Sequence, residues 1–382
     1  MKNNKEYYEL TKLFMKKLPY KDIPYSKRNW GNNWHSLCSY HGKLKPSIAH
    51  HLVDQFTDIG DLVLDPMSGV GTIPLEACLQ GRVGIGNDMS ELAYIVTKAK
   101  VGKVSKESVY VVIERLENYI LKHKNEYINE NELPYQDFGL NGRLPEYFHK
   151  DTYIEILCAR AYFKDKKMEL SNEEAVVFSC LLHVLHGNRP YALSRQSHPL
   201  TPYSPKGDFI YKNVIVHIKN KVELVYKNES EEVFTTGNAI YGDLFDLDSK
   251  VGKVDAIITS PPFFDSIRFY ISNWMRLWLT GWEPGDFKRE DDRFIESKQK
   301  RSLDIYNDLF DLSSKLLKDK GIMIMHLGKS KKCDMALELA NRAGKYFLVV
   351  NVMNEDSSSF EKHGILDKGA TVEHQFLFLQ KL

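Results

Sequence analysis

The four residues Ser260-Pro261-Pro262-Phe263 directly follow the apolar run VDAIIT, which has the length and composition of a buried strand. The two prolines restrict the backbone and donate no hydrogen bonds, so the carbonyl group of Pro261 is left as an acceptor. The hydroxyl group of Ser260 provides a second acceptor beside it. Two acceptors in one rigid turn can hold the two hydrogens of an amino group. A simple turn after a strand is the alternative interpretation of the same residues.

A second segment, DPMSGVGT (65–72), joins another apolar run to a predicted helix. Gly69 and Gly71 allow the backbone to approach a ligand closely, and the helix directs its N-terminal N–H groups at the same place. Asp88 ends the next predicted strand, where a carboxylate is placed to accept both hydroxyl groups of a ribose. This spacing predicts a nucleoside-binding site, although the G-x-G-x-x-G pattern of dinucleotide enzymes is not met. A tight turn without a ligand is the alternative.

The stretch 62–90 resembles the S-adenosylmethionine site of methyltransferases that act on exocyclic amines of DNA bases, and HGKLKPSIAHHLV (41–53) is similar to the segment that precedes this site in that family. The resemblance implies that Asp65 lies near the methionine part of the cofactor and Asp88 near its ribose. Asp243 matches the position that contacts adenine. The cofactor-binding residues that the resemblance implies are Lys43, Pro46, Asp65, Pro66, Met67, Ser68, Gly69, Gly71, Thr72, Asp88, Met89 and Asp243.

The proline tetrapeptide resembles the catalytic motif of the same family, whose members usually have Tyr where this chain has Phe263. Two acceptors on an exocyclic amine would turn its lone pair toward the methyl group of the sulfonium donor, and orientation of this kind contributes ~7–11 kcal/mol. The ring of Phe263 would support a base that has left the stack, a contact worth ~1–3 kcal/mol. The opening serine resembles the cytosine-N4 branch more than the adenine-N6 branch. The residues implied in catalysis are Ser260, Pro261, Pro262 and Phe263, with Phe264 as a substrate contact.

Residues 101–235 interrupt the alternation of strands and helices and are predicted to form an inserted, largely helical region. Because it stands between the cofactor loop and the tetrapeptide, the insert resembles the target-recognition region of the family. Its irregular stretch 187–205 combines basic and aromatic residues in a mix suited to phosphate and base-edge contacts, and a rigid structural loop is the alternative. The substrate contacts predicted there are Arg189, Arg195 and His198.

Around these motifs the sequence predicts an α/β protein with the Rossmann-like fold of class I methyltransferases, in which a seven-stranded, mostly parallel sheet carries the insert. The catalytic core would comprise residues 1–100 and 236–382, with the cofactor site in 41–100 and the catalytic loop at 259–264. The predicted strands are 62–65, 82–88, 235–240, 254–260, 322–328, 346–353 and 372–379. The predicted helices include 46–56, 72–80, 90–100 with Ser90 as its cap, and 173–186.

Some tryptophan, histidine and charged residues are interpreted as structural rather than functional. Trp274 and Trp278, four residues apart, are expected in the core. His183 and His186 share an apolar helix and are expected to pack there rather than to bind a metal. The charge-dense stretch 286–301 is expected to be a solvated, mobile loop.

The composition is that of a soluble globular protein, with 382 residues of which 43% are hydrophobic and 27% charged. The 52 basic and 51 acidic residues leave a net charge of +1, which argues against nucleic-acid binding by bulk charge. Residues 1–50 carry ten Lys and Arg against three Asp and Glu, a surplus of +7 that could contact phosphate or belong to a frayed terminus. The chain shows no secretion signal and no membrane span, so a cytoplasmic location is expected.

The five cysteines show no C-x-x-C spacing, so neither a disulfide framework nor a zinc site is indicated, and no metal is expected. None of them follows a proline. This disfavours cytosine-C5 methylation, because that reaction needs a cysteine nucleophile.

The sequence thus predicts a site-specific, S-adenosylmethionine-dependent methyltransferase that forms N4-methylcytosine in double-stranded DNA with the target base flipped out. A restriction-modification or related DNA-marking context is expected, and a cognate restriction endonuclease is the partner that this context suggests. The alternatives are methylation of adenine N6 in DNA, methylation of guanine N2 in RNA, and a DNA-binding relative that has lost catalysis.

Overall fold

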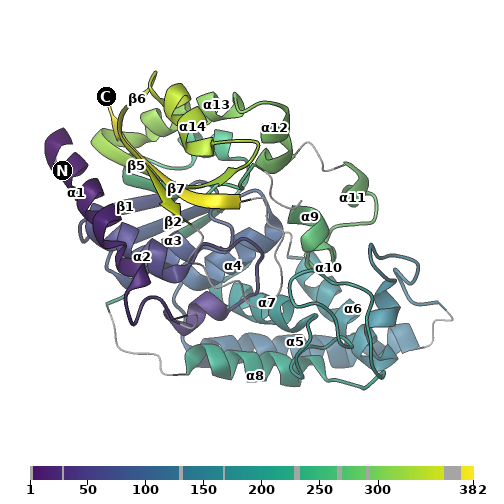
Figure 1. Ribbon diagram of the computed structural model, residues 1–382. Coiled ribbons are helices and arrows are strands. Elements are labelled where there is room, and N and C mark those ends of the chain that lie inside the picture. Colours follow the sequence, from purple (N-terminus) through teal and green to yellow (C-terminus); the bar gives the residue numbers. More distant parts are fainter. Residues whose placement is uncertain are drawn as a thin grey trace.

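The computed structural model describes residues 3–27, 30–128, 132–166, 168–227, 233–264, 269–289, 293–356 and 371–382. Within these residues, a sheet of seven strands has the order β3-β2-β1-β4-β5-β7-β6, and β7 runs antiparallel to both of its neighbours while the other pairs are parallel (Figure 1). The strands are β1 (Leu62–Asp65), β2 (Val83–Asp88), β3 (Asn238–Tyr241), β4 (Val254–Thr259), β5 (Leu317–Ser330), β6 (Phe347–Asp356) and β7 (Thr371–Lys381). The predicted seven-stranded, mostly parallel sheet is confirmed.

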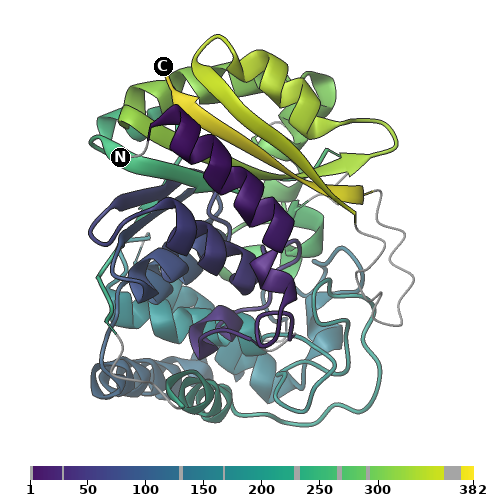
Figure 2. The same ribbon diagram turned by 60° about the vertical axis from the view of Figure 1, so that its left-hand side comes forward.

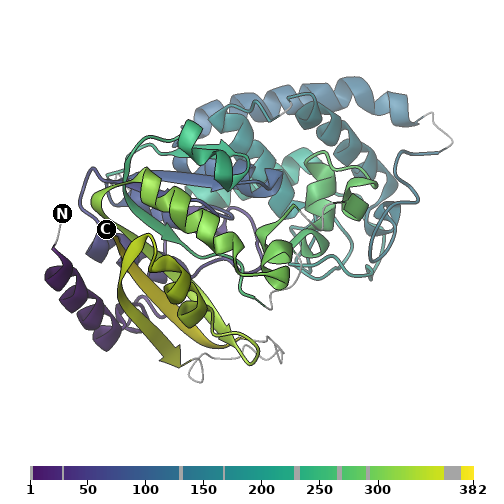
Figure 3. The same ribbon diagram turned by 90° about the horizontal axis from the view of Figure 1, so that it is seen from above.

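The sheet buries both of its faces, because successive side chains of a strand point to opposite sides. One face, with Ile258 and Ile324, packs against the helices α1, α2 and α3. The opposite face, with Ile257 and Met323, packs against α13 and α14. In Figure 3, which looks from above, α1 (purple) and α13 (green) lie on different sides of the strands. These helices are α1 (Asn4–Lys17), α2 (Pro46–Phe56), α3 (Thr72–Leu79), α13 (Ile305–Leu316) and α14 (Met335–Ala343).

Helix α1 is a packed part of the fold, so the frayed-terminus alternative is wrong for residues 4–17. Tyr7 and Phe14 are 1% and 0% exposed. Their rings contact Phe56 of α2 and Phe378 of β7, with ring centroids 5.5–6.4 Å apart. Figure 2 shows α1 lying across β6 and β7. Part of the basic surplus of the N-terminal segment is therefore carried by an ordered helix.

The helices after β2 pack into one apolar cluster that reaches from α4 to α10. Trp274 and Trp278 of α10 are both 0% exposed, which confirms their predicted place in the core. The helix predicted at 173–186 is present as α7, and the role of the region in target recognition stays a prediction. The helices of this cluster are α4 (Glu91–Val101), α5 (Lys106–Ile128), α6 (Lys150–Lys164), α7 (Asn172–Val184), α8 (Val214–Tyr226) and α10 (Trp274–Leu279). Short 3₁₀ helices comprise Pro19–Lys21, Asn33–Ser36, Leu144–Tyr147 and Leu244–Ser249.

Ser90 precedes α4 as predicted, but its side chain does not cap the helix. The N–H group of Ser90 donates to the Asp88 carboxylate at 2.9 Å. The Ser90 hydroxyl group is buried and has no hydrogen-bond partner among the described residues. Ser90 is thus the N-cap residue by position, but the Asp88 carboxylate at the end of β2 holds this turn, and the Ser90 hydroxyl group does not.

Replacing Gly71, at the start of α3, by alanine is expected to lower the free energy of unfolding by a large amount. Its φ of +66° disfavours a side chain, and a Cβ atom there would lie 2.8 Å from Oγ1 of Thr97. Gly60 has a φ of +88° with no heavy atom of the described residues within 4 Å of its added Cβ, so it is a matched control. Urea unfolding should show a loss of about 1 kcal/mol for Gly60→Ala and about 2–4 kcal/mol for Gly71→Ala. Equal losses would mean that close approach to α4 contributes nothing.

Candidate active site

A cavity of about 330 Å³ opens at the carboxyl ends of β1, β2, β3 and β4. Ligand sites of open α/β sheets gather at this edge. The loop after β1, the end of β2, the turn after β3 and the tetrapeptide after β4 all contribute to the wall. Segments almost 200 residues apart in the sequence, Asp65 and Ser260, therefore face one space.

Most of the residues that the sequence singled out line this cavity, and six of them do not. Those in the wall are Lys43, Asp65, Pro66, Met67, Ser68, Gly69, Thr72, Asp88, Met89, Asp243, Ser260, Pro261, Pro262 and Phe263. Those outside the wall are Pro46, Gly71, Phe264, Arg189, Arg195 and His198. Pro46 begins α2 behind the wall, and Gly71 allows α4 to approach α3 closely.

The Asp88 carboxylate is held by the backbone at the end of β2. The N–H groups of Gly69 and Ser90 each donate to one of its oxygens at 2.9 Å. Each carboxylate oxygen can accept a further hydrogen bond. Burial raises the pKa of Asp88 to about 6. The side chain is therefore a rigid acceptor, fixed to the glycine loop and facing the cavity.

Asp65, at the end of β1, is 3% exposed. One of its oxygens accepts from the hydroxyl of Thr259 at 2.7 Å and from the N–H of Met67 at 3.2 Å. Burial raises the pKa of Asp65 to about 7. Among the described residues neither Asp65 nor Asp88 forms an ion pair. A buried carboxylate, Asp65, and a partly buried one, Asp88, in one cavity are suited to a ligand that brings a positive charge and hydroxyl groups.

The segment 40–44 covers the glycine loop. A Cβ atom at Gly69 would be in ordinary contact with the ring of Tyr40, at 3.4 Å, so the φ of +50° rather than a lack of space favours glycine here. The ammonium group of Lys43 donates to the carbonyl of His35 at 2.7 Å. The ring of His35 contacts Glu76 of α3 at 2.6 Å. The cover is thereby anchored to the helix that follows the loop.

The tetrapeptide is held by two neighbouring elements. The hydroxyl oxygen of Ser260 lies 3.2 Å from Nδ1 of His326 in β5. The side-chain amide of Gln299 donates to the carbonyl of Pro262 at 3.0 Å, and its oxygen accepts from the hydroxyl of Tyr306 at 2.9 Å. These contacts fix the turn independently of its two prolines.

Phe263 packs against the backbone of β5 and also lines the cavity. A Cβ atom at Gly328 would come within 2.4 Å of the Phe263 ring, so the ring rests directly on the strand backbone. Its centroid is 5.7 Å from that of His326 and 5.8 Å from that of His374. The ring is half-buried, and its role as a platform for a base stays a prediction. Phe264 packs instead beside the apolar cluster under α13.

The stretch 286–301 was expected to be a solvated loop, and the structure contradicts this outside residues 290–292, which lie beyond the described part of the chain. It contains α11 (Asp286–Arg289) and α12 (Ile295–Arg301), preceded by α9 (Phe269–Ser272). Glu296 and Gln299 are 4% and 0% exposed. Buried polar residues at helical spacing in a charged segment have no hydrophobic signature, so this part of the wall is not predictable from the local sequence.

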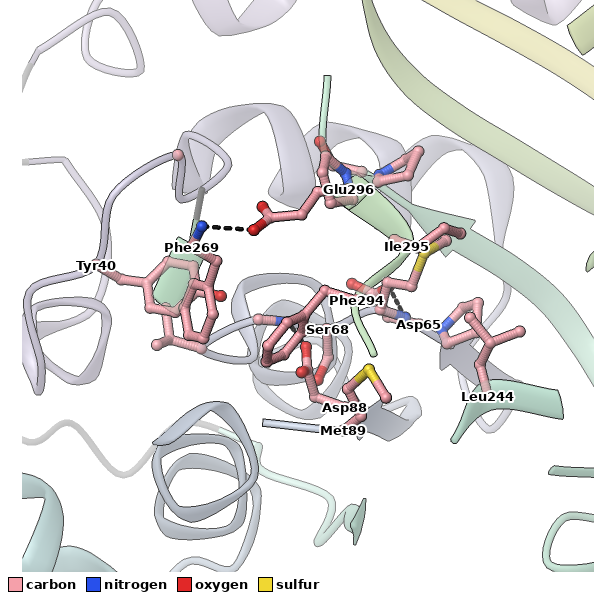
Figure 4. A pocket seen from close by; sticks show the side chains of 18 of the residues that line it. Tyr40, Asp65, Ser68, Asp88, Met89, Leu244, Phe269, Phe294, Ile295 and Glu296 are labelled. Carbon is pink, nitrogen blue, oxygen red and sulfur yellow. Dashed lines mark hydrogen bonds between the residues drawn. The ribbon is translucent and has the colours of Figure 1, made fainter. Parts of the chain in front are cut away.

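Three aromatic rings, those of Tyr40, Phe269 and Phe294, line the cavity. Figure 4 shows Tyr40 and Phe269 side by side, with Phe294 near the middle of the view. The ring centroids of Tyr40 and Phe269 are 5.4 Å apart, and those of Phe269 and Phe294 are 5.7 Å apart. Glu296 accepts a hydrogen bond from the N–H of Phe269 at 2.6 Å and so joins α12 to α9. This wall could accept a planar group.

The predicted substrate contacts of the insert have different surroundings. The Arg195 guanidinium donates to the carbonyls of Gly207 at 2.6 Å and Glu146 at 2.9 Å. Nδ1 of His198 accepts from two backbone N–H groups within its own turn, at 3.2 and 3.3 Å. Arg189 is exposed. Arg195 and His198 thus brace the loop, and contact of the three with nucleic acid stays a prediction.

The histidines of the apolar helix region are packed as expected. His186 is 1% exposed, and the His183 ring stacks on Tyr191 with centroids 5.1 Å apart. Within the described ranges, no three His, Cys, Asp or Glu side chains are grouped so as to hold a metal ion. A helix with the length and apolarity needed to cross a membrane is likewise not found in the part of the chain that the structure describes.

Residues 34–134 match the family of RMKL-like methyltransferase domains. The type II methyltransferase M.MthZI of Methanothermobacter thermautotrophicus is 30% identical over 87 residues, which are 22% of this chain and 24% of that protein. The type II methyltransferase M.MjaII of Methanocaldococcus jannaschii is 22% identical over 184 residues, 43% of this chain and 35% of that protein. Among solved structures, TrmN from Thermus thermophilus is 13% identical with a TM-score of 0.33, covering 90% of this chain and 50% of that chain.

The fold is the Rossmann-like class I methyltransferase fold, as its strand order and antiparallel β7 define. The matched domain comprises β1, the glycine loop that follows it and β2, which are the elements on one side of the cavity. The chain spans 24% and 35% of the length of the two curated relatives. A methyltransferase domain is thus matched over residues 34–134, within the fold that class I methyltransferases share.

Proposed function

We propose that this protein transfers a methyl group from S-adenosylmethionine to the exocyclic N4 amine of cytosine in DNA. The observation that carries the proposal is the shared cavity. Gly69 and Asp88, on the cofactor side, and Ser260 and Pro261, on the amine side, line the same space. A methyl donor and an amine bound to these two sets of residues would meet at the edge of the sheet.

The acidic residues of the cavity fit the parts of the cofactor. Asp243 would accept from the adenine amine, and Asp88 from the ribose hydroxyls. Asp65 would face the sulfonium charge, because it is a buried carboxylate with no cationic side chain of the described residues paired to it. Small residues in the loop after β1 leave room for the methionine part.

The amine side of the cavity orients the acceptor. Ser260 and Pro261 would each accept one hydrogen of the amine, so that its lone pair points away from the ring of the base. When bound, the cofactor would supply the methyl carbon. The amine nitrogen would bond to this carbon while the carbon–sulfur bond breaks and sulfur keeps its electron pair. The nitrogen would then lose one proton to water. Phe263 would support the base, flipped out of double-stranded DNA.

The choice of cytosine N4 in DNA rests on Ser260 and on the relatives. Adenine-N6 and guanine-N2 enzymes typically open this motif with Asn or Asp, whereas this chain has Ser260. Two relatives are type II methyltransferases. Residues 101–235 would read the DNA sequence, in a restriction-modification or related context in the cytoplasm, with a cognate endonuclease as partner.

The test is methyl transfer from tritiated cofactor to duplex DNA of mixed sequence, followed by mass analysis of the nucleosides. N4-methyldeoxycytidine is the expected product. N6-methyldeoxyadenosine would overturn the choice of cytosine. In a parallel assay with RNA as the substrate, label that enters the RNA while the DNA stays unlabelled would overturn the choice of DNA. An intact, cofactor-binding protein that labels neither would support a relative without catalysis.

Cofactor affinity is expected to fall as the pH drops below about 7, the pKa to which burial raises Asp65. A carboxyl group with a raised pKa is neutral below that value, and the sulfonium cation favours its ionised form, so binding then requires loss of a proton. Asp88, with a pKa of about 6, adds to the fall at lower pH. Calorimetry between pH 8.5 and 5.5 should show a steeper loss for S-adenosylmethionine than for S-adenosylhomocysteine, which lacks the charge. If the affinities for the two ligands fall equally with pH, Asp65 does not interact with the sulfonium charge.

A further inference from the structure

We propose that His326 is a positioning residue whose ring accepts a hydrogen bond from the Ser260 hydroxyl group. The lone pairs of the Ser260 oxygen then face the cavity. This inference rests on the proposed amine-transfer function. The register of the sheet sets up the contact, because Thr259 of β4 pairs with Met325 of β5 and the next residues along both strands are Ser260 and His326. Nδ1 of His326 lies 3.2 Å from Oγ of Ser260.

The surroundings of His326 explain an aromatic ring but do not explain an imidazole. The residue is 4% exposed, and its ring contacts Phe263 and Phe376, with centroids 5.7 and 5.1 Å away. Its Nε2 is buried without a hydrogen-bond partner among the described residues. Burying a polar ring costs free energy that a phenyl ring would not. A phenylalanine would lack both ring nitrogens. Of these two, only Nδ1 has a partner among the described residues, namely the hydroxyl group of Ser260.

The direction of this hydrogen bond matters for the amine. Burial, and then the neighbouring His374, hold the pKa of His326 well below its usual value, so the ring is neutral and one nitrogen is an acceptor. If Nδ1 is that acceptor, the Ser260 hydrogen points away from the cavity and both lone pairs of its oxygen remain for the amine. The opposite arrangement would direct a hydrogen at the hydrogens of the amine.

Two substitutions separate this role from packing. His326→Phe keeps the ring and removes the acceptor, whereas His326→Asn keeps a polar atom near the position of Nδ1 and removes the ring. We expect His326→Phe to be at least as stable as the wild type and to lose roughly tenfold in kcat, with the Kd for S-adenosylhomocysteine within about twofold. His326→Asn should be less stable and retain more of the turnover. The reverse order of turnover would assign His326 to packing.

A double-mutant cycle with Ser260→Ala tests whether the effect passes through the hydroxyl group. In the Ser260→Ala background, His326→Phe should change kcat by less than about threefold. A tenfold loss in both backgrounds would overturn the proposal. The ¹⁵N chemical shifts of the His326 ring should place the hydrogen on Nε2, and a hydrogen on Nδ1 would contradict the stated direction.

These outcomes are distinct from a failure of the proposed function. If the wild-type protein methylates another exocyclic amine, the cycle is measured on that amine and the role of His326 stands or falls by the same criteria. If the wild-type protein methylates no amine, the proposed function fails. The stability comparison and the ring nitrogen shifts still show in that case whether His326 is bonded to Ser260 as stated.

Discussion

Replacing Ser260 by alanine is expected to lower the turnover number roughly 100-fold while leaving the dissociation constant for the cofactor within about twofold of the wild-type value. The reason is that the Ser260 oxygen would act on the amine, not on the cofactor. It lies in the turn after β4 and is held there by His326 at 3.2 Å. A preorganised polar group aimed at the reacting atom contributes mainly to the rate of the chemical step.

Single-turnover transfer of tritium and calorimetric titration with S-adenosylhomocysteine measure these two quantities. Ser314→Ala is the matched control, because the Ser314 hydroxyl donates to the Asp311 carbonyl within α13, away from the cavity wall. It should match the wild type in both measurements. A Ser260→Ala protein that turns over normally would remove Ser260 from the amine side, and equal losses of turnover and affinity would contradict its separate role.

Asp88→Ala should have the opposite profile, with roughly 100-fold weaker cofactor binding and little loss of turnover at saturating cofactor. Hydrogen bonds to an ionised group contribute about 1.5–3 kcal/mol each, and the ribose offers two hydroxyl groups. Asp88 also holds the N–H groups of Gly69 and Ser90, so the variant loses part of the loop's support. Asp88→Asn, which retains one acceptor oxygen, should therefore have an intermediate affinity.

The control for Asp88→Ala is Asp255→Ala, because Asp255 also binds a backbone N–H. Its carboxylate accepts from the N–H of Leu62 at 2.9 Å and from Lys318 at 2.8 Å, at the end of the sheet opposite the cavity. We expect Asp255→Ala to lower the unfolding midpoint and to leave cofactor affinity unchanged. If the two variants weaken binding alike, loss of stability rather than loss of a ribose contact explains Asp88→Ala.

The strands and the cavity follow from local patterns. Short apolar runs that end in Asp65, Asp88 and Ser260 predict strands, and the carboxyl ends of parallel strands must share an edge. The cofactor loop and the tetrapeptide were therefore expected to meet, and both line one cavity. In the same way, the apolar spacing of 46–56 predicted α2, which buries Ile48, Leu52, Val53 and Phe56 at 6% exposure or less.

The parts that the sequence did not indicate depend on partners far away in the chain. Gln299 reads as one polar residue in a charged segment, yet it is 0% exposed and bound to Pro262. His326 reads as one polar residue in an apolar strand, and its meaning depends on the register of β5 beside β4. Arg195 is predicted as a phosphate contact, and that role stays a prediction; the sequence does not indicate that its guanidinium also donates to the backbone carbonyls of Gly207 and Glu146. Contacts between residues far apart in the chain cannot be predicted from the preferences of neighbouring residues.

In the proposed arrangement, the donor sulfur and the tetrapeptide face each other across the cavity. A crystal structure with bound S-adenosylhomocysteine tests this directly. We expect the ribose hydroxyl groups to bind Asp88, the adenine to lie beside Asp243, and the sulfur to point across the cavity at Ser260. A ligand bound outside this cavity, or inside it with its sulfur turned away from Ser260, would rule out methyl transfer between these two groups of residues.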